Sequence, residues 1–256
     1  PGNRSVLLRG AAGSGKSIVL VERLARLIER SPVGQPRSVL VTSFNKDMVR
    51  QLARWFTDRM DSVGISRFTR TNRSESCIEF SGVGTGSDQV TFCNWDQAPT
   101  RLAGLTLDSH VTHDSVWVRE AGSITEELLA TNPDFRPLGS DNYAADPEFQ
   151  LMELRRVVYG LMATTKEKYL EVERTGRGGR GIGRVQRELV WSVIERAPQS
   201  TFTHRRIHLL EEAIAGHING EFTDLFVDEA QDFLPADIEC CYALRRGNNP
   251  VFMVVD

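Results

Sequence analysis

Short apolar runs alternate with helix-like apolar spacing over the first hundred residues of the chain. Residues 6–9 form an apolar run that is typical of a buried strand, and residues 38–44 are apolar and β-branched enough for a strand buried on both faces. Residues 17–30 and 45–60 place apolar side chains three and four positions apart, which is typical of helices that cover such strands. This strand–helix–strand–helix order predicts an α/β fold: a parallel sheet with helices on both faces.

After a weak strand at 77–80 and a better one at 89–95, the pattern changes and later returns. Mainly helical spacing follows, and the predicted helices are 124–131, 147–162, 165–173, 183–196 and 203–218. The earlier alternation resumes with an apolar strand at 224–227, a helix at 235–246 and an apolar strand at 251–255. The returning pattern indicates that one α/β domain continues on the far side of a helical segment.

A glycine-rich segment follows the first predicted strand. Residues 10–17 read G-A-A-G-S-G-K-S and fit G-x-x-x-x-G-K-[ST] (Walker A) at every fixed position, between a strand and a helix as that motif requires. Glycines let backbone N–H groups turn toward phosphate oxygens, and the next helix points its positive end there. Lys16 can neutralise the β- and γ-phosphates of ATP while the Ser17 hydroxyl binds Mg²⁺. The candidate ATP-phosphate residues are Gly10, Ala12, Gly13, Ser14, Gly15, Lys16 and Ser17. A glycine-rich turn that matches by chance is the alternative.

A second candidate segment, D-E-A-Q-D at 228–232, follows the apolar strand 224–227. Two acids after such a strand lie at the carboxyl edge of a parallel sheet, where ligands of open α/β folds bind. Phosphoryl transfer to water needs a carboxylate that holds Mg²⁺ and a group that deprotonates the attacking water. We expect Asp228 to bind Mg²⁺, Glu229 to act as the base and Gln231 to sense the γ-phosphate or that water. A charged turn after a buried strand is the alternative.

The distance along the chain between these two motifs predicts the domain organisation. A compact α/β domain of roughly 100 to 150 residues does not need all the residues between Lys16 and Asp228. We therefore expect a first part of the ATP-binding domain at 1–99, an inserted mainly helical domain at 100–218 and a second part of the ATP-binding domain at 219–256.

Charge and cysteine usage narrow the class of protein. The net charge is −3, so contact with nucleic acid would have to come from local basic segments, of which residues 174–206 and 50–73 are the candidates. An uneven solvated surface is the alternative for each segment. The four cysteines show no C-x-x-C spacing, which argues against a zinc site. No apolar run of about 18 residues and no signal peptide is present, so we expect a cytoplasmic protein without a membrane partner.

The two motifs together resemble the first RecA-like domain, with its inserted domain, of superfamily 1 helicases of the UvrD/Rep type. Residues 10–17 match motif I, and 228–232 match the D-E-x-Q-D form of motif II, which separates this group from P-loop kinases. Asn45 and Lys46 match the N-K of motif Ia, where the family contacts single-stranded DNA. Residues 91–95 resemble motif Ib, T-F-H-S-[FW], and depart from it at Cys93 and Asn94.

The resemblance implies an enzyme, an ATP-dependent DNA helicase or translocase, with single-stranded or forked DNA and the second RecA-like domain of the same protein as partners. The implied and candidate nucleic-acid residues are Phe44, Asn45, Lys46, Thr91, Trp95, Arg177 and Arg180. For Phe44 and Trp95 the alternative is core packing, and for the two arginines it is a surface loop.

Residues 251–256 look like the strand of motif III, and the chain ends before the glutamine that usually follows. The upstream glutamine that reads adenine and the second-domain arginines that reach the γ-phosphate are also outside it. We therefore expect an N-terminal fragment that binds nucleotide but hydrolyses it poorly, because such arginines contribute about 10³ to 10⁵ in rate.

Two other functions stay open from the sequence. The first is a P-loop NTPase switch or signalling ATPase that uses no nucleic-acid track. The second is a degenerate nucleotide-binding scaffold that serves only as an interaction module, against which the intact Lys16, Ser17, Asp228 and Glu229 argue.

Overall fold

The computed structural model of the chain describes nine stretches of it. They are residues 5–32, 35–64, 68–74, 77–82, 87–97, 111–138, 142–173, 182–218 and 220–256. The chain divides into two compact units. The first unit comprises Pro1–Leu105, Glu212–Phe233 and Ile238–Asp256, and the second comprises Thr106–Glu211 and Leu234–Asp237. The predicted boundaries at 99/100 and 218/219 remain a prediction.

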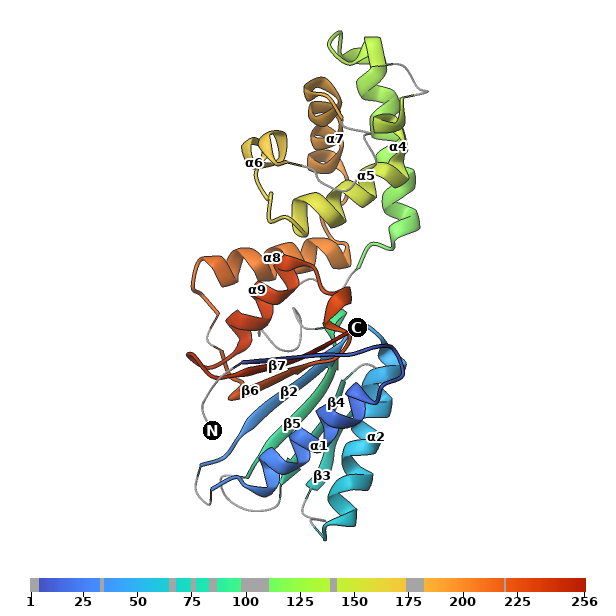
Figure 1. Ribbon diagram of the computed structural model, residues 1–256. Helices are drawn as coiled ribbons and strands as arrows, with labels where there is room; N and C mark the ends of the chain where they lie inside the picture. The colour runs from blue at the N-terminus through green and yellow to red at the C-terminus, as the bar shows by residue number, and fades with distance from the viewer. Residues whose placement is uncertain are drawn as a thin grey trace. The chain divides into compact units, whose positions relative to one another are not determined.

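A seven-stranded sheet forms the centre of the first unit (Figure 1). Its strands are β1 (Val6–Arg9), β2 (Ser38–Ser43), β3 (Phe68–Ser74), β4 (Cys77–Gly82), β5 (Gln89–Asn94), β6 (Asp224–Val227) and β7 (Val251–Val255). Their order is β1-β7-β6-β2-β5-β4-β3. Neighbours from β1 to β5 pair in parallel, whereas β4 pairs antiparallel with both β5 and β3. The α/β class with a mostly parallel sheet is confirmed, and the antiparallel end is an addition to it.

Two amphipathic helices cover one face of this sheet, α1 (Lys16–Glu29) and α2 (Lys46–Ser62). Their buried faces, which include Leu24 and Phe56, share one core with the side chains of the strands. Figure 1 shows helix α9 (Pro235–Leu244) on the opposite face. Because the sheet is covered on both sides, its central strands can be apolar throughout, as β6 is.

The second unit is helical. Its elements are α4 (Asp114–Thr131), η2 (Arg136–Leu138), η3 (Tyr143–Ala145), α5 (Pro147–Glu153), the π-helix η4 (Leu154–Tyr159), α6 (Lys166–Glu171), α7 (Arg184–Arg196) and most of α8 (Phe202–Ile214). Its own apolar core gathers Trp117, Leu154, Tyr169 and Leu189. The prediction of mainly helical structure over 123–218 is confirmed for the described residues.

The bounds of three predicted helices are wrong. The helix predicted at 203–218 ends at Ile214, as α8. Helix α4 begins at Asp114, well before the predicted start at 124, and the predicted helix 147–162 is an α-helix that continues as a π-helix and ends at Tyr159. The early turns of α4 contain Val116, Val118 and Gly122, which are poor helix formers. Burial of Trp117 and Ala121 in the core of the second unit outweighs these local preferences.

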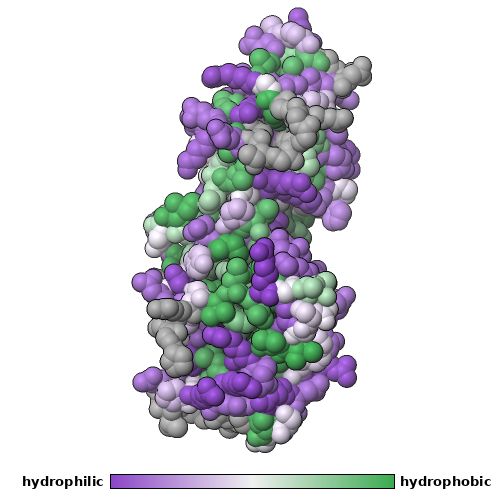
Figure 2. Space-filling view, in the orientation of Figure 1, coloured by the Kyte–Doolittle hydropathy of each residue, from purple (hydrophilic) through white to green (hydrophobic). Residues whose placement is uncertain are grey.

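Figure 2 shows apolar residues exposed over the strands of the first unit. The exposed large apolar side chains include Leu7, at 63% exposure, and Ile18, at 61%, in β1 and at the start of α1. Among the described helices, none combines the length and the hydropathy that a membrane span requires.

Candidate functional site

The glycine-rich segment forms the turn between β1 and α1. Gly13 and Gly15 have φ values of +75° and +84°, a left-handed conformation that favours glycine. Within the described chain, the Ser14 amide donates to the Ala11 carbonyl at 3.1 Å, whereas no protein acceptor is found for the amides of Gly15, Lys16 and Ser17. Unpaired N–H groups at the start of a helix are a ready-made site for an anion.

The Lys16 side chain folds back over this turn and is only 8% exposed. Its ammonium donates to the carbonyl oxygens of Gly10 and Ala11, each at 2.8 Å. It also forms an ion pair of 2.5 Å with the Asp256 carboxylate. The cation of the loop is therefore held at the first two residues of the turn and at the end of β7.

The Ser17 hydroxyl lies 3.0 and 3.1 Å from the two carboxylate oxygens of Asp228, although the residues are 211 positions apart in the chain. Asp228 is fully buried at the end of β6, and its amide donates to the Thr42 carbonyl of β2 at 2.9 Å. Burial raises the pKa of the Asp228 carboxyl above its ordinary value, and the Ser17 hydrogen bond opposes that rise. A bound cation would favour the charged carboxylate at this position.

Glu229 follows Asp228 in a left-handed backbone conformation, with φ of +52°. That conformation is uncommon for a residue other than glycine and often marks a functional site. The Gln231 side-chain amide donates to the Glu229 carboxylate, and its carbonyl oxygen accepts from the Asp256 amide at 3.2 Å. Gln231 therefore holds the Glu229 carboxylate on one side and the end of β7 on the other.

The strand order explains how these groups meet. β7 lies between β1 and β6, and all three strands run parallel, so the phosphate loop, Asp256 and Asp228 follow adjacent carboxyl ends of one sheet edge. Sequence reasoning missed Asp256. The available signal was an acid directly after an apolar strand, which is the same signal that identified Asp228.

The residues present fit a magnesium nucleotide. A hydroxyl and a carboxylate are hard oxygen ligands, and Mg²⁺ is usually held by one or two carboxylates together with substrate phosphates and water. In the part of the chain that the structure describes, no group of three or more His, Cys, Asp or Glu side chains forms a metal cage. The free amides and Lys16 offer the complementary site for phosphate.

Comparison with protein families agrees with this geometry. The family described as the UvrD/REP helicase N-terminal domain matches residues 1–168. The chain belongs to this family. The curated proteins contained no significant match to the sequence. As in the family, the chain is thus part of a helicase motor, and the roles of its individual residues are proposals developed below.

Aromatic side chains gather at the next part of the same edge of this UvrD/REP domain. Phe44 follows β2 and Trp95 follows β5, at the start of η1 (Trp95–Gln97); their rings lie 4.7 and 5.4 Å from the ring of Phe233. Trp95 is fully buried, so its observed role is packing, the alternative that the sequence left open. Phe44 is half-buried. Phe233 was missed because a lone Phe after the acidic segment gives no local signal.

The predicted motif Ia residues begin helix α2. Asn45 caps this helix: its side-chain oxygen accepts from the amides of Asp47, at 2.9 Å, and Met48, at 3.2 Å. Lys46 is exposed at the first helical position. The structure thus places Phe44, Asn45 and Lys46 together at the carboxyl end of β2.

Of the other nucleic-acid candidates that the structure describes, Thr91 is not brought to this place. Thr91 lies in the middle of β5, paired in register with Leu40 of β2. Arg177 and Arg180 lie outside the described residues. Asn94, where the sequence departs from motif Ib, is buried and donates to the Phe44 carbonyl at 2.6 Å, so its side chain positions the end of β2.

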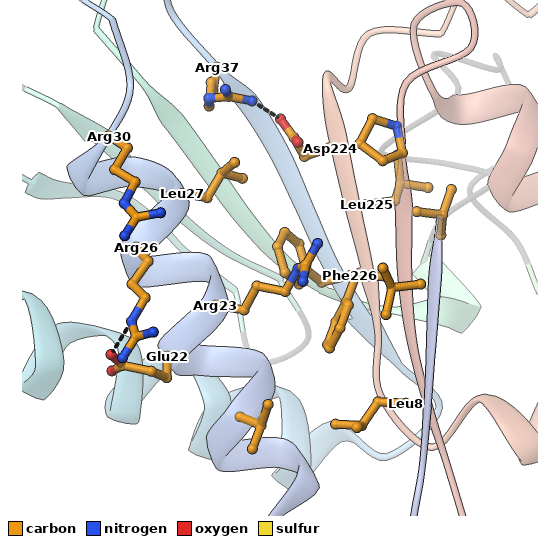
Figure 3. Close-up of a pocket in the computed structure, with 15 residues that line it drawn as sticks. Leu8, Glu22, Arg23, Arg26, Leu27, Arg30, Arg37, Asp224, Leu225 and Phe226 are labelled. Carbon is orange, nitrogen blue, oxygen red and sulfur yellow. Dashed lines mark hydrogen bonds and ion pairs between the residues drawn. The ribbon is translucent and has the colours of Figure 1, made fainter. Parts of the chain in front are cut away.

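A separate pocket of about 720 Å³ lies between α1 and strands β1, β6 and β7 (Figure 3). Its lining includes the rings of Phe226 and Phe252 and the guanidinium of Arg23, which stacks over Phe252 at 4.7 Å. None of the residues of the phosphate loop lines it. Figure 3 shows the Arg37–Asp224 pair near Leu225, at the start of β6. This pocket is therefore distinct from the candidate site.

Proposed function

We propose that this chain is the ATP-binding motor domain of an ATP-dependent DNA helicase or translocase, which couples hydrolysis of Mg-ATP to movement on single-stranded DNA. One observation carries the proposal: the Ser17 hydroxyl and the buried Asp228 carboxylate are within 3.1 Å of each other, in a chain that belongs to the UvrD/REP family. This contact joins the phosphate loop to the acidic segment at one sheet edge.

In this proposal the segment from Gly10 to Ser17 binds the phosphates. The unpaired amides of Gly15, Lys16 and Ser17 and the ammonium of Lys16 would supply the positive potential, while Ala12, Gly13 and Ser14 form the exposed turn. Ser17 and Asp228 would hold Mg²⁺ in the position where they now contact each other. When bound, the metal would supply neutralisation of charge on the β- and γ-phosphates.

The Glu229 carboxylate would accept a proton from the attacking water. Its strained backbone and the hydrogen bond from Gln231 fix the direction of the carboxylate before substrate arrives. Gln231 would orient the same water, or sense the γ-phosphate, from the same loop. Residues 1–256 alone are expected to hydrolyse ATP slowly, because the family resemblance assigns the γ-phosphate arginines to a second RecA-like domain.

Single-stranded DNA would pass over the carboxyl end of β2. Phe44 offers a half-exposed ring for base stacking, worth about 1 to 3 kcal/mol per base. The exposed Lys46 ammonium suits a backbone phosphate. Arg177 and Arg180 remain candidates for contact with the DNA backbone.

The phosphate-site assignment is tested by equilibrium binding of a fluorescent ATP analogue in Mg²⁺. Lys16→Ala is expected to weaken binding about tenfold or more, which corresponds to about 1.4 kcal/mol or more. Lys46→Ala is the matched control, because it removes an exposed lysine outside the phosphate loop and should bind like wild type. Equal binding by wild type and Lys16→Ala would falsify the assignment.

A further inference from the structure

The Lys16 ammonium is held by three groups of the protein itself. It donates hydrogen bonds to the carbonyl oxygens of Gly10 and Ala11, each at 2.8 Å, and it forms an ion pair of 2.5 Å with the Asp256 carboxylate. An ammonium has three N–H donors, and two of them serve these carbonyl oxygens. A phosphate oxygen that binds Lys16 would therefore share the ammonium with the Asp256 carboxylate.

Of the three partners, Asp256 is the one that a phosphate meets as a competitor. Its carboxylate is the only anion among them, so it attracts the charge of the ammonium and repels an incoming phosphate. It is 41% exposed, whereas Lys16 is 8% exposed, so the carboxylate stands on the solvent side of the pair.

The fold fixes Asp256 in this position. β7 pairs with β1 in parallel register, with Val254 beside Leu8 and Val255 beside Arg9, and the Gly10 amide donates to the Val255 carbonyl at 3.3 Å. The Asp256 amide also donates to Gln231 at 3.2 Å. The carboxylate therefore meets Lys16 because of the sheet register and not through a mobile loop.

We propose that Asp256 sets the nucleotide affinity of this site by competing with the phosphates for the Lys16 ammonium. The inference rests on the proposed function, since it assumes that the phosphate loop binds nucleotide. It assigns Asp256 a role in affinity that is separate from the metal-binding role of Asp228. Mg²⁺ on the nucleotide offsets the negative charge of the phosphates and should reduce the competition.

The test is binding of a fluorescent ADP to the whole chain, first in EDTA and then in Mg²⁺. Asp256→Asn keeps the size of the side chain and removes its charge, and is expected to tighten binding in EDTA about tenfold, with a smaller gain in Mg²⁺. Asp256→Glu keeps the charge and should stay closer to wild type. Asp232→Asn removes an exposed carboxylate of the neighbouring loop that does not contact Lys16, and should change binding less than about twofold.

The outcomes separate the inference from the function on which it rests. If Asp256→Asn binds ADP no more tightly than wild type in EDTA while Lys16→Ala loses binding, the site is a phosphate site and the inference is wrong. An equal gain for Asp232→Asn would also overturn it, because general charge would then explain the effect. If Lys16→Ala binds like wild type, the proposed function itself fails. Asp256→Ser, which also lacks the charge, repeats the test if Asp256→Asn folds poorly.

Discussion

Asp228 and His204 show one physical cause acting on two kinds of side chain. Burial disfavours the charged form of each, so it raises the pKa of the Asp228 carboxyl and lowers the pKa of the His204 imidazole to about 4. Glu22 shows the opposite case. Hydrogen bonds from Arg59, at 2.6 Å, and from Arg26 lower the pKa of Glu22 to about 2. The immediate surroundings of each residue move its pKa away from the ordinary value, and the type of the residue decides the direction in which burial moves it.

His204 should make the protein less stable in acid. Its imidazole bonds to the Thr201 hydroxyl at 2.7 Å, and its other ring nitrogen is buried without a partner among the described residues. Below pH 6.5, the ordinary pKa of histidine, the His204 imidazole is protonated in the unfolded chain. In the folded chain it stays neutral until about pH 4. The free energy of unfolding should therefore fall by up to about 3 kcal/mol between pH 7 and pH 4 because of this residue.

Denaturant unfolding of wild type and His204→Asn across that range measures the effect. Asn keeps a hydrogen-bonding atom near Thr201 and does not titrate, so the difference in stability between the two proteins should shift in favour of the variant as the pH falls. A pH-independent difference would mean that the imidazole has the same pKa in the folded and the unfolded chain, and so is not buried.

At the scale of elements, side-chain caps decide where helices begin. Asn45 is a favourable cap for α2, and the sequence placed the start of that helix within one residue. His113 caps α4 through its ring nitrogen, which accepts from the Ser115 amide at 3.3 Å. Histidine is not a preferred cap, so the start of α4 had no signal in the sequence.

Two variants at Asn45 can separate an effect on the stability of the protein from an effect on the binding of DNA. Asn45→Ala leaves the Asp47 and Met48 amides without their acceptor and should lower the free energy of unfolding by about 1 kcal/mol. Asn45→Asp keeps the acceptor and should unfold like wild type, yet its negative charge should weaken binding of single-stranded DNA. Thermal or denaturant unfolding and DNA binding are measured on both variants. Loss of stability in Asn45→Asp would show that the cap is not what stabilises the helix.

For the whole molecule, the net charge of −3 means that DNA must be held by a local surface. Many described arginines of the basic segments are already paired: Arg59 binds Glu22 and Glu29, and Arg196 binds Glu127. These pairs favour a structural role for much of the positive charge. Lys46, exposed at the end of β2, has no ion pair within the described chain.

Binding of labelled oligo-dT at several salt concentrations tests the proposed contact with single-stranded DNA. The logarithm of the association constant should fall linearly with the logarithm of the salt concentration, with a slope of about −0.7 per phosphate contacted. Lys46→Ala should weaken binding and make the slope shallower by about one contact. Lys166→Ala is the control, since Lys166 is likewise exposed at the first position of a helix, α6.

A response that does not depend on salt, or no binding at all, would favour the alternative of an NTPase switch without a nucleic-acid track. Equal losses for Lys46→Ala and Lys166→Ala would show only a general charge effect. Either result would leave the phosphate site itself untouched, because that site is tested by nucleotide binding.

The sequence by itself determined the phosphate loop, the positions of the strands β1, β6 and β7, and the acids that follow β6. The predicted burial of residues 6–9 is wrong, because β1 is an edge strand in which Leu7 is exposed. The correctly predicted features depend on neighbours in the chain: glycines where φ is positive, apolar residues in short runs, and a helix that starts at the next turn. For the same reason Lys16, Ser17, Asp228 and Glu229 could be named as candidates before any fold was known.

Only the tertiary structure decided which of these segments meet. The order β1-β7-β6-β2 brings Ser17 to Asp228 and Asp256 to Lys16, and the tilted ring of Phe233 packs against Phe44. The tertiary structure also pairs β4 antiparallel with both β5 and β3. β3 has few apolar residues, so its sequence does not predict a strand. Strand order depends on packing among segments that are distant in the chain. It therefore cannot be predicted from the spacing of apolar residues within each segment.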